Sequence, residues 1–150
     1  MILRVEIYWQ SLPQNGENRK FDVCIAAKAT PNIELSRLRS TIKVGVTGCY
    51  EKDINLKIVE KLKLFLEMEG IKVLLIRDGD YGLYEETDSN KKNADMRNRV
   101  KFIEETQPDL TISIHQNSYS DESIRGAQTF FDSSSEESKK LAQMVQESLH

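Results

Sequence analysis

His115 ends a short segment whose residue pattern predicts a buried strand. Between residues 109 and 118, apolar positions alternate with polar ones, and the apolar ones are Leu110, Ile112 and Ile114. In α/β folds, binding sites form where strands end, and imidazole is a common metal ligand. Hydrogen-bonding groups follow at Gln116, Asn117 and Ser118. His115 is therefore a candidate ligand, although a structural hydrogen bond would also explain it.

Glu51 is the second candidate, at the expected start of a helix. A helix that follows one strand and begins near the carboxyl edge of a sheet places its first residue beside neighbouring strand ends. Glu51 and His115 would then share one rim and supply two zinc donors, whereas catalytic zinc typically takes three. The alternative is that Glu51 and Asp53 only stabilise the helix dipole, by about 0.3–1 kcal/mol.

Other kinds of site have less support in the sequence. There is no G-x-S-x-G motif, P-loop or G-x-G-x-x-G motif. Arg97 and Arg99 could bind a carboxylate together. The alternative, which the sequence favours, is that they are surface residues that face Asp95 and Glu104.

The composition describes one acidic domain. A chain of 150 residues with net charge −3 and interspersed basic residues does not predict nucleic-acid binding. Cys24 and Cys49 form no C-x-x-C motif, so a disulfide framework or a cysteine zinc site is not expected. No apolar run is long enough for a membrane span, and no signal peptide is visible. Taken alone, this predicts a cytoplasmic chain or a fragment without its export signal.

From Lys43 onward, helical and strand patterns alternate. We expect helices over 51–69 and 91–106, a last helix opened by a capping box at 134–137, and strands over 71–76, 109–115 and 127–131. Gly70 is expected to end the first helix. The fold class is therefore α/β, a single domain with a mostly parallel central sheet flanked by helices. The residues expected to face inward from the helices are Ile54, Ile58, Leu62, Phe65 and Leu66, then Ala94, Val100 and Ile103, then Leu141, Met144, Val145 and Leu149.

Residues 1–42 have a different character. Pro13, Gly16 and Pro31 interrupt short apolar pieces, so we expect an irregular segment. Two stretches within it, 2–8 and 21–26, have the composition of strands.

Five segments resemble, in order and spacing, the zinc-dependent N-acetylmuramoyl-L-alanine amidases of the amidase type 3 family, most closely the sporulation-type enzymes that act on spore cortex. The resemblance covers about residues 43–149. The segments are EKDINL at 51–56, VLLIRD at 73–78, ADMRNR at 94–99, SIHQNS at 113–118 and GAQTFF at 126–131.

The resemblance implies a peptidoglycan hydrolase that cleaves the amide between N-acetylmuramic acid and the L-alanine of the stem peptide. In this family zinc is held by a histidine, a glutamate and a second histidine. Glu51 matches the glutamate, His115 matches the second histidine, and Asn117 matches a polar residue beside the site, which implies a substrate contact. The resemblance also implies action outside the cytoplasm, at the cell wall or spore.

The sequence departs from the family in two places. The family's first histidine lies in a glycine-rich loop, and residues 32–42 contain no histidine. The family's catalytic glutamate lies beyond residue 150, and Glu136 and Glu137 belong to the helix before it. We therefore expect residues 1–42 not to match the family, through a shifted reading frame or a different gene start, and 43–150 to form a partial catalytic domain, incomplete at its C-terminal end. The alternative to an amidase is a non-catalytic domain that binds cell wall or a partner.

Overall fold

The computed structural model describes residues 2–10, 22–27, 51–117 and 126–149. Within them the elements follow the order β1 (Ile2–Trp9), β2 (Asp22–Ala27), α1 (Glu51–Met68), β3 (Lys72–Leu75), α2 (Lys91–Thr106), β4 (Leu110–Asn117), β5 (Gln128–Phe131) and α3 (Glu136–Ser148). The helices and strands expected from Glu51 onward are all present. The two strands suggested within the N-terminal segment are present as β1 and β2.

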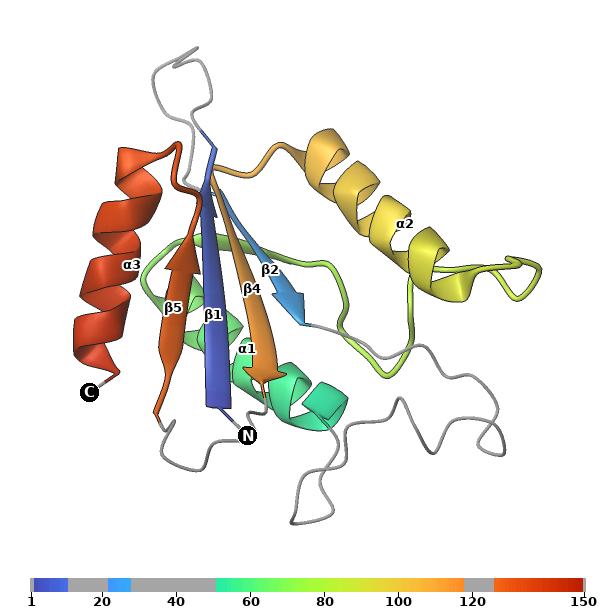
Figure 1. Cartoon of the computed structure of the whole chain (residues 1–150), viewed down its shortest axis with the longest axis horizontal. Coiled ribbons are helices and arrows are strands. Elements are labelled where there is room, and N and C mark those ends of the chain that lie inside the picture. The colour runs from blue at the N-terminus through green and yellow to red at the C-terminus, as the bar shows by residue number, and fades with distance from the viewer. Residues whose placement is uncertain (1, 11–21, 28–50, 118–125, 150) are drawn as a thin grey trace.

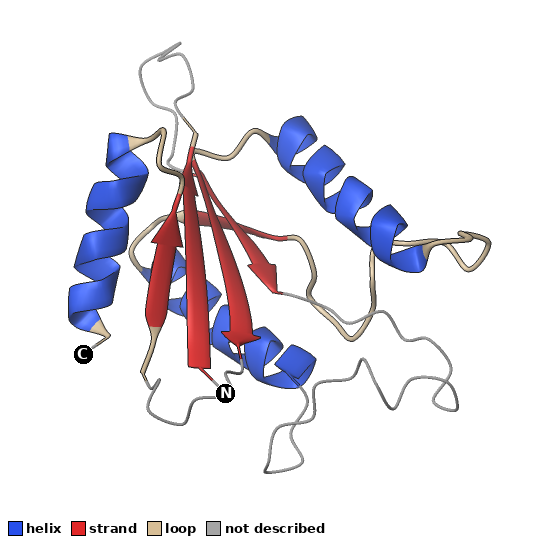
Figure 2. Ribbon diagram, in the orientation of Figure 1, coloured by secondary structure: helices blue, strands red, loops and turns tan. Residues whose placement is uncertain are grey.

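The strands form one sheet in the order β3-β2-β4-β1-β5 (Figures 1 and 2). β2 runs parallel to β3 and β4, and β1 runs parallel to β5. The β1–β4 pair is antiparallel, so three of the four neighbouring pairs are parallel. The mostly parallel α/β fold expected from the sequence is confirmed. The N-terminal strand thus lies between two strands that come late in the chain.

Two apolar clusters cover the two faces of this sheet. The larger lies under α1 and α3, where Val59 and Ala142 pack against strand residues such as Ile7 and Ile25. The smaller lies under α2, where Phe102 and Ile103 pack on the β2 side of the sheet. In Figure 1, α1 runs behind the sheet, while α2 lies to one side and leaves the front of β4, β1 and β5 open.

Local chain chemistry sets the helix ends. Gly70 has φ +79°, and Ile71 N donates to Leu66 O at 3.0 Å, so Gly70 ends α1 as expected. Ser135 caps α3 by accepting a hydrogen bond from Ser138 N at 3.1 Å. None of the helices in the described part of the chain is long and apolar enough to cross a bilayer.

Four residues expected to face inward are exposed instead: Phe65, Val100, Met144 and Leu149. Each helix buries a narrower face than the sequence pattern predicted, and some of the buried positions are polar. Ser138 of α3 is fully buried because its Oγ accepts a hydrogen bond from Trp9 N at 2.7 Å. In α2, Asp95 and Arg99 are buried as an ion pair, and Val100, the next residue, points outward.

Candidate functional site

Glu51 reaches the end of β4 from the first turn of α1. Its carboxylate is buried, and Oε1 accepts a hydrogen bond from the main-chain N of Gln116 at 3.0 Å. The last residue pair between β2 and β4 is Ala27 with Ile114, so Gln116 extends past the end of β2. The Glu51 side chain therefore accepts a hydrogen bond from a main-chain N–H of β4 that lies beyond the end of β2. The donor of this bond belongs to the residue that follows His115.

A polar network continues from this contact along α1. The Gln116 side chain donates from Nε2 to Asn55 Oδ1 at 3.4 Å, and Asn55 is fully buried. Asn55 lies one helical turn after Glu51, so both residues present polar atoms to the same end of β4. The start of α1 is thus fixed to β4 by hydrogen bonds rather than by apolar packing alone.

Arg77 holds the same helix end from the side of β3. Its side chain is buried, Nη2 donates to Lys52 O at 3.1 Å, and Nη1 donates to Gly79 O at 2.5 Å. Burial lowers the pKa of Arg77, and the nearby Arg99 guanidinium lowers it further. Lys52 also forms an ion pair with Asp80 in the loop after β3. These contacts fix the turn that carries Glu51.

His115 lies on the opposite face of β4 from Gln116, since neighbouring residues in a strand point to opposite faces. Its Nε2 lies 3.2 Å from Glu6 Oε2 and 2.8 Å from Ser113 Oγ. The Glu6 carboxylate comes from β1, which pairs with β4 so that Arg4 is opposite His115 and Glu6 is opposite Ser113. Two strands from opposite ends of the sequence thus build the surroundings of His115.

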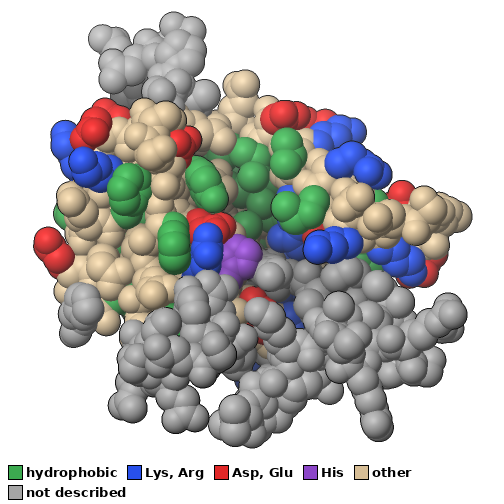
Figure 3. Space-filling model, viewed as in Figure 1, with side chains coloured by type: hydrophobic (Ala, Val, Ile, Leu, Met, Phe, Trp, Pro, Cys, Tyr) green, Lys and Arg blue, Asp and Glu red, His purple; other side chains and the backbone are tan. Residues whose placement is uncertain are grey.

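Arg4 completes this cluster. Its Nε donates to Glu6 Oε1 at 2.9 Å, its Nη2 lies 2.7 Å from the same oxygen, and its guanidinium stacks 3.9 Å from the Phe130 ring centroid. The pKa of Tyr8 on the same face is raised by burial and then by the Glu6 charge. Figure 3 shows the histidine at the surface, with acidic, basic and hydrophobic side chains around it.

Glu6 and Arg4 were not predicted as site residues from the sequence. A signal was present, because polar Arg4, Glu6 and Tyr8 alternate with apolar residues along β1. That alternation identifies a strand with one polar face, but it does not identify the strand beside it.

Asn117 is the last residue of β4, where its backbone pairs with Ile2. Its side chain falls outside the part of the chain that the structure describes, so a substrate contact stays a prediction. Arg99 donates from Nε to Asp95 Oδ2 at 2.7 Å within the protein interior. The expected pairing with Asp95 is therefore confirmed, although the pair is buried rather than on the surface.

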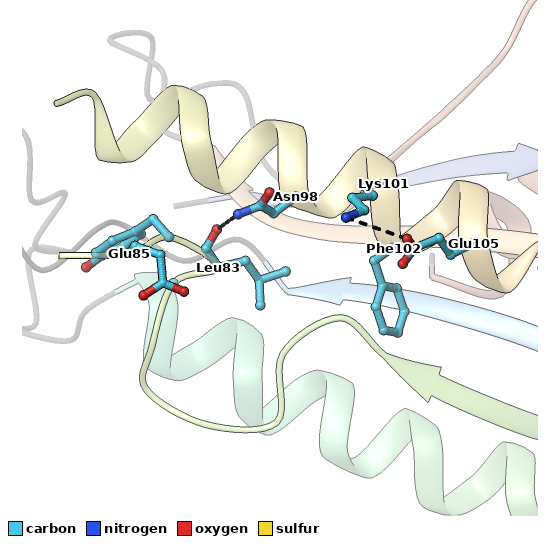
Figure 4. Close-up of a pocket in the computed structure, with 8 residues that line it drawn as sticks. Leu83, Glu85, Asn98, Lys101, Phe102 and Glu105 are labelled. Atoms are coloured by element: carbon cyan, nitrogen blue, oxygen red, sulfur yellow. Dashed lines mark hydrogen bonds and ion pairs between the residues drawn. The ribbon is translucent and has the colours of Figure 1, made fainter. Parts of the chain in front are cut away.

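A shallow pocket of about 390 Å³ lies between α2 and the loop before it (Figure 4). Asn98 Nδ2 donates to Leu83 O at 2.6 Å across it, and Lys101 and Glu105 pair at 3.7 Å beside it. None of the residues predicted to bind metal or substrate lines this pocket. The candidate site therefore lies at the end of β4 and not in this pocket.

The donors at the end of β4 fit zinc in kind, since a carboxylate and an imidazole are common zinc ligands. The buried Glu51 carboxylate bonds the main-chain N of Gln116, the residue after His115, and the His115 side chain points to the other face of β4. Among the described residues, no group of three His, Cys, Asp or Glu side chains is close enough to hold a metal. The sequence has two histidines, His115 and His150, so the family's first histidine has no counterpart in its usual place.

Comparison with known proteins identifies related chains. Residues 40–150 match the family model Amidase_3, described as N-acetylmuramoyl-L-alanine amidase. The chain is 33% identical over 102 residues to a germination-specific N-acetylmuramoyl-L-alanine amidase of Bacillus subtilis (strain 168), covering 66% of this chain and 43% of that protein. It is 31% identical over 106 residues to the N-acetylmuramoyl-L-alanine amidase LytC of the same organism, covering 68% of this chain and 19% of LytC.

A solved structure has a similar fold. The CwlD amidase from Clostridioides difficile, in complex with the GerS lipoprotein, aligns with a TM-score of 0.70 and 29% sequence identity. The alignment covers 87% of this chain and 65% of that chain. The chain spans less than half the length of the two curated relatives, at 43% and 19%.

Proposed function

Because the chain belongs to the N-acetylmuramoyl-L-alanine amidase family, we propose that it is a zinc-dependent peptidoglycan hydrolase. In this proposal it cleaves the amide bond between N-acetylmuramic acid and the L-alanine of the stem peptide. The observation that carries the proposal is the 3.0 Å hydrogen bond from Gln116 N to Glu51 Oε1. It supports the proposal because Gln116 directly follows His115 at the end of β4, in a chain of this family.

Glu51 and His115 hold the zinc in this proposal. Bound there, zinc would supply a water whose pKa is lowered to about 7 and would polarise the amide carbonyl of the substrate. Glu51 is suited to hold a cation because Gln116 N fixes one of its oxygens and Arg77 fixes the turn that carries it. Asn117 is the proposed substrate contact, since it follows His115 by two residues at the end of β4.

The proposed substrate is peptidoglycan, in the cell wall or in spore cortex, and the proposed place of action is outside the cytoplasm. The open front of β4, β1 and β5 supports this choice of substrate, because a glycan with attached peptides needs an accessible surface rather than a closed cavity (Figure 3). The germination-specific relative supports the choice of spore material.

A second candidate function is a non-catalytic domain that binds cell wall or a partner. The observation in its favour is that the described residues supply two zinc-type donors at the end of β4 and no cluster of three. Two ligands hold zinc more weakly than three. In this alternative the scaffold is kept and hydrolysis is lost.

One experiment separates the two functions. The purified chain is incubated with zinc and isolated peptidoglycan, and released stem peptides are detected by mass spectrometry and by labelling of new L-alanine amino groups. We expect release by the wild-type chain, none by Glu51→Gln or His115→Gln, and wild-type release by Glu60→Gln, which changes an exposed residue of the same helix. Binding to peptidoglycan without release by the wild-type chain would establish the alternative.

A further inference from the structure

The carboxylate of Glu6 lies between two nitrogen-bearing side chains and uses a different oxygen for each. Oε1 accepts from Arg4 Nε at 2.9 Å, and Oε2 lies 3.2 Å from His115 Nε2. The side chains of Glu6 and His115 are 18% and 21% exposed, so solvent screens this pair less than a pair on an open surface. Each oxygen has a defined partner, which fixes the orientation of the carboxylate.

The strand that carries Glu6 is held firmly in place. Val5 and Ile7 on either side of Glu6 are buried in the larger apolar cluster under α1 and α3. β1 pairs with β4 along Ile2–Trp9 and with β5 from Arg4 to Ile7. The Arg4 guanidinium stacks on the ring of Phe130 in β5. The position of Glu6 is thus set by the sheet and not by a loop.

The contact with Glu6 favours one tautomer of His115. A carboxylate accepts hydrogen bonds, so a neutral His115 that bonds Glu6 carries its proton on Nε2. Ser113 Oγ, 2.8 Å from the same nitrogen, can share that proton. In proteins a histidine that binds metal through one nitrogen commonly donates from the other to a carboxylate, which fixes the ring and its tautomer.

We propose that Glu6 is a positioning residue for His115, so that β1, which lies outside the matched residues 40–150, is part of the site. In this proposal Glu6 keeps the proton on Nε2, and Nδ1 is the nitrogen that would bind the metal. Arg4 acts through Glu6 by fixing its other oxygen. The metal part of this proposal rests on the proposed function, whereas the contact between Glu6 and His115 does not.

The first test uses the metal-free full chain, labelled with ¹⁵N, at about pH 8, where an ordinary imidazole is neutral. Long-range ¹H–¹⁵N spectra report the tautomer, and His115→Gln assigns the signals against those of His150. We expect the Nε2–H tautomer of His115 in the wild type and a mixture of tautomers in Glu6→Met. Glu6→Gln should keep the Nε2–H tautomer, because its side chain still offers an oxygen acceptor. Glu60→Met is the matched control, and thermal unfolding shows that each variant is folded.

The second readout is zinc affinity, measured by competition with a chromophoric chelator. We expect Glu6→Met to weaken binding by about 10- to 100-fold and Arg4→Met to weaken it less. Loss of the Nε2 proton when the wild type binds zinc, or an unchanged tautomer in folded Glu6→Met, would overturn the positioning role. The two proposals can fail separately. If Glu6→Met changes the His115 tautomer but the wild-type chain hydrolyses no peptidoglycan, the proposed function is overturned and the contact between Glu6 and His115 stands.

Discussion

Two carboxylates reach the last residues of β4 from different parts of the sequence. Glu51 lies in α1, within the family match over 40–150, and accepts a hydrogen bond from the main chain of Gln116. Glu6 lies in β1, outside that match, and contacts the side chain of His115. Glu51 is 4% exposed, whereas the Glu6 side chain is 18% exposed. One carboxylate is therefore part of the buried framework, and the other orients a ring on the open face.

The largest difference is expected on removal of each carboxylate. Glu51→Ala leaves the buried Gln116 N–H without its acceptor, which costs about 1–3 kcal/mol of unfolding free energy, and it abolishes zinc binding. Glu6→Ala removes a partly exposed ion pair and costs at most about 1 kcal/mol. Urea unfolding and chelator competition measure both quantities. Equal losses of stability in the two variants would contradict the distinction between framework and orienting carboxylate.

Arg77→Met tests whether the framework around Glu51 extends to β3. The variant removes the donors to Lys52 O and Gly79 O, so we expect a loss of about 1–3 kcal/mol in unfolding free energy. Zinc affinity should fall as well, because the turn that carries Glu51 is released. Arg97→Met removes an exposed guanidinium from α2 and serves as the control. If the folded Arg77→Met chain binds zinc as tightly as the wild type, Arg77 does not contribute to the zinc site.

Arg4→Met sharpens the comparison on the open face. Arg4 contacts Glu6 and the Phe130 ring at a partly exposed position, so its loss is expected to cost less than about 1 kcal/mol. Thermal unfolding measures this change. A loss as large as that of Glu51→Ala would show that the open-face cluster is also part of the framework.

The smallest effect is expected for chemical labelling of Cys24 and His115, whose side chains lie on the same face of the sheet. Cys24 lies on the α2 side of β2, is fully buried, and burial raises the pKa of its thiol to about 12. We therefore expect Cys24 to remain unmodified by a thiol reagent at about pH 8 in the native chain, whereas diethylpyrocarbonate modifies His115. Mass spectrometry of peptides locates both modifications. Rapid labelling of native Cys24 would show that α2 does not cover this half of the sheet.

The sequence sufficed for features that depend on local pattern. The helical period of 51–69, the glycine at its end and the alternation before His115 each specify an element without reference to distant residues. The approach of Glu51 to the end of β4 also followed from the order of strand and helix. The buried faces were less predictable, since Phe65 and Val100 are exposed while Ser138 is buried through a hydrogen bond to Trp9 N.

The role of β1 could not be read from the sequence, because a strand pattern does not specify its neighbours. The polar face formed by Arg4, Glu6 and Tyr8 was visible, but its partner His115 lies more than a hundred residues away. Pairing between β1 and β4 is a non-local contact that depends on the whole sheet. The neighbours of His115 were therefore found only in the folded chain.

Zinc titration shows whether Glu51 and His115 hold zinc at the end of β4. The metal-free chain is titrated against a chromophoric chelator in parallel with Glu51→Gln, His115→Gln and the surface control Glu60→Gln. We expect one zinc per wild-type or control chain and loss of that binding in both site variants. Unchanged zinc affinity in either folded site variant would contradict it.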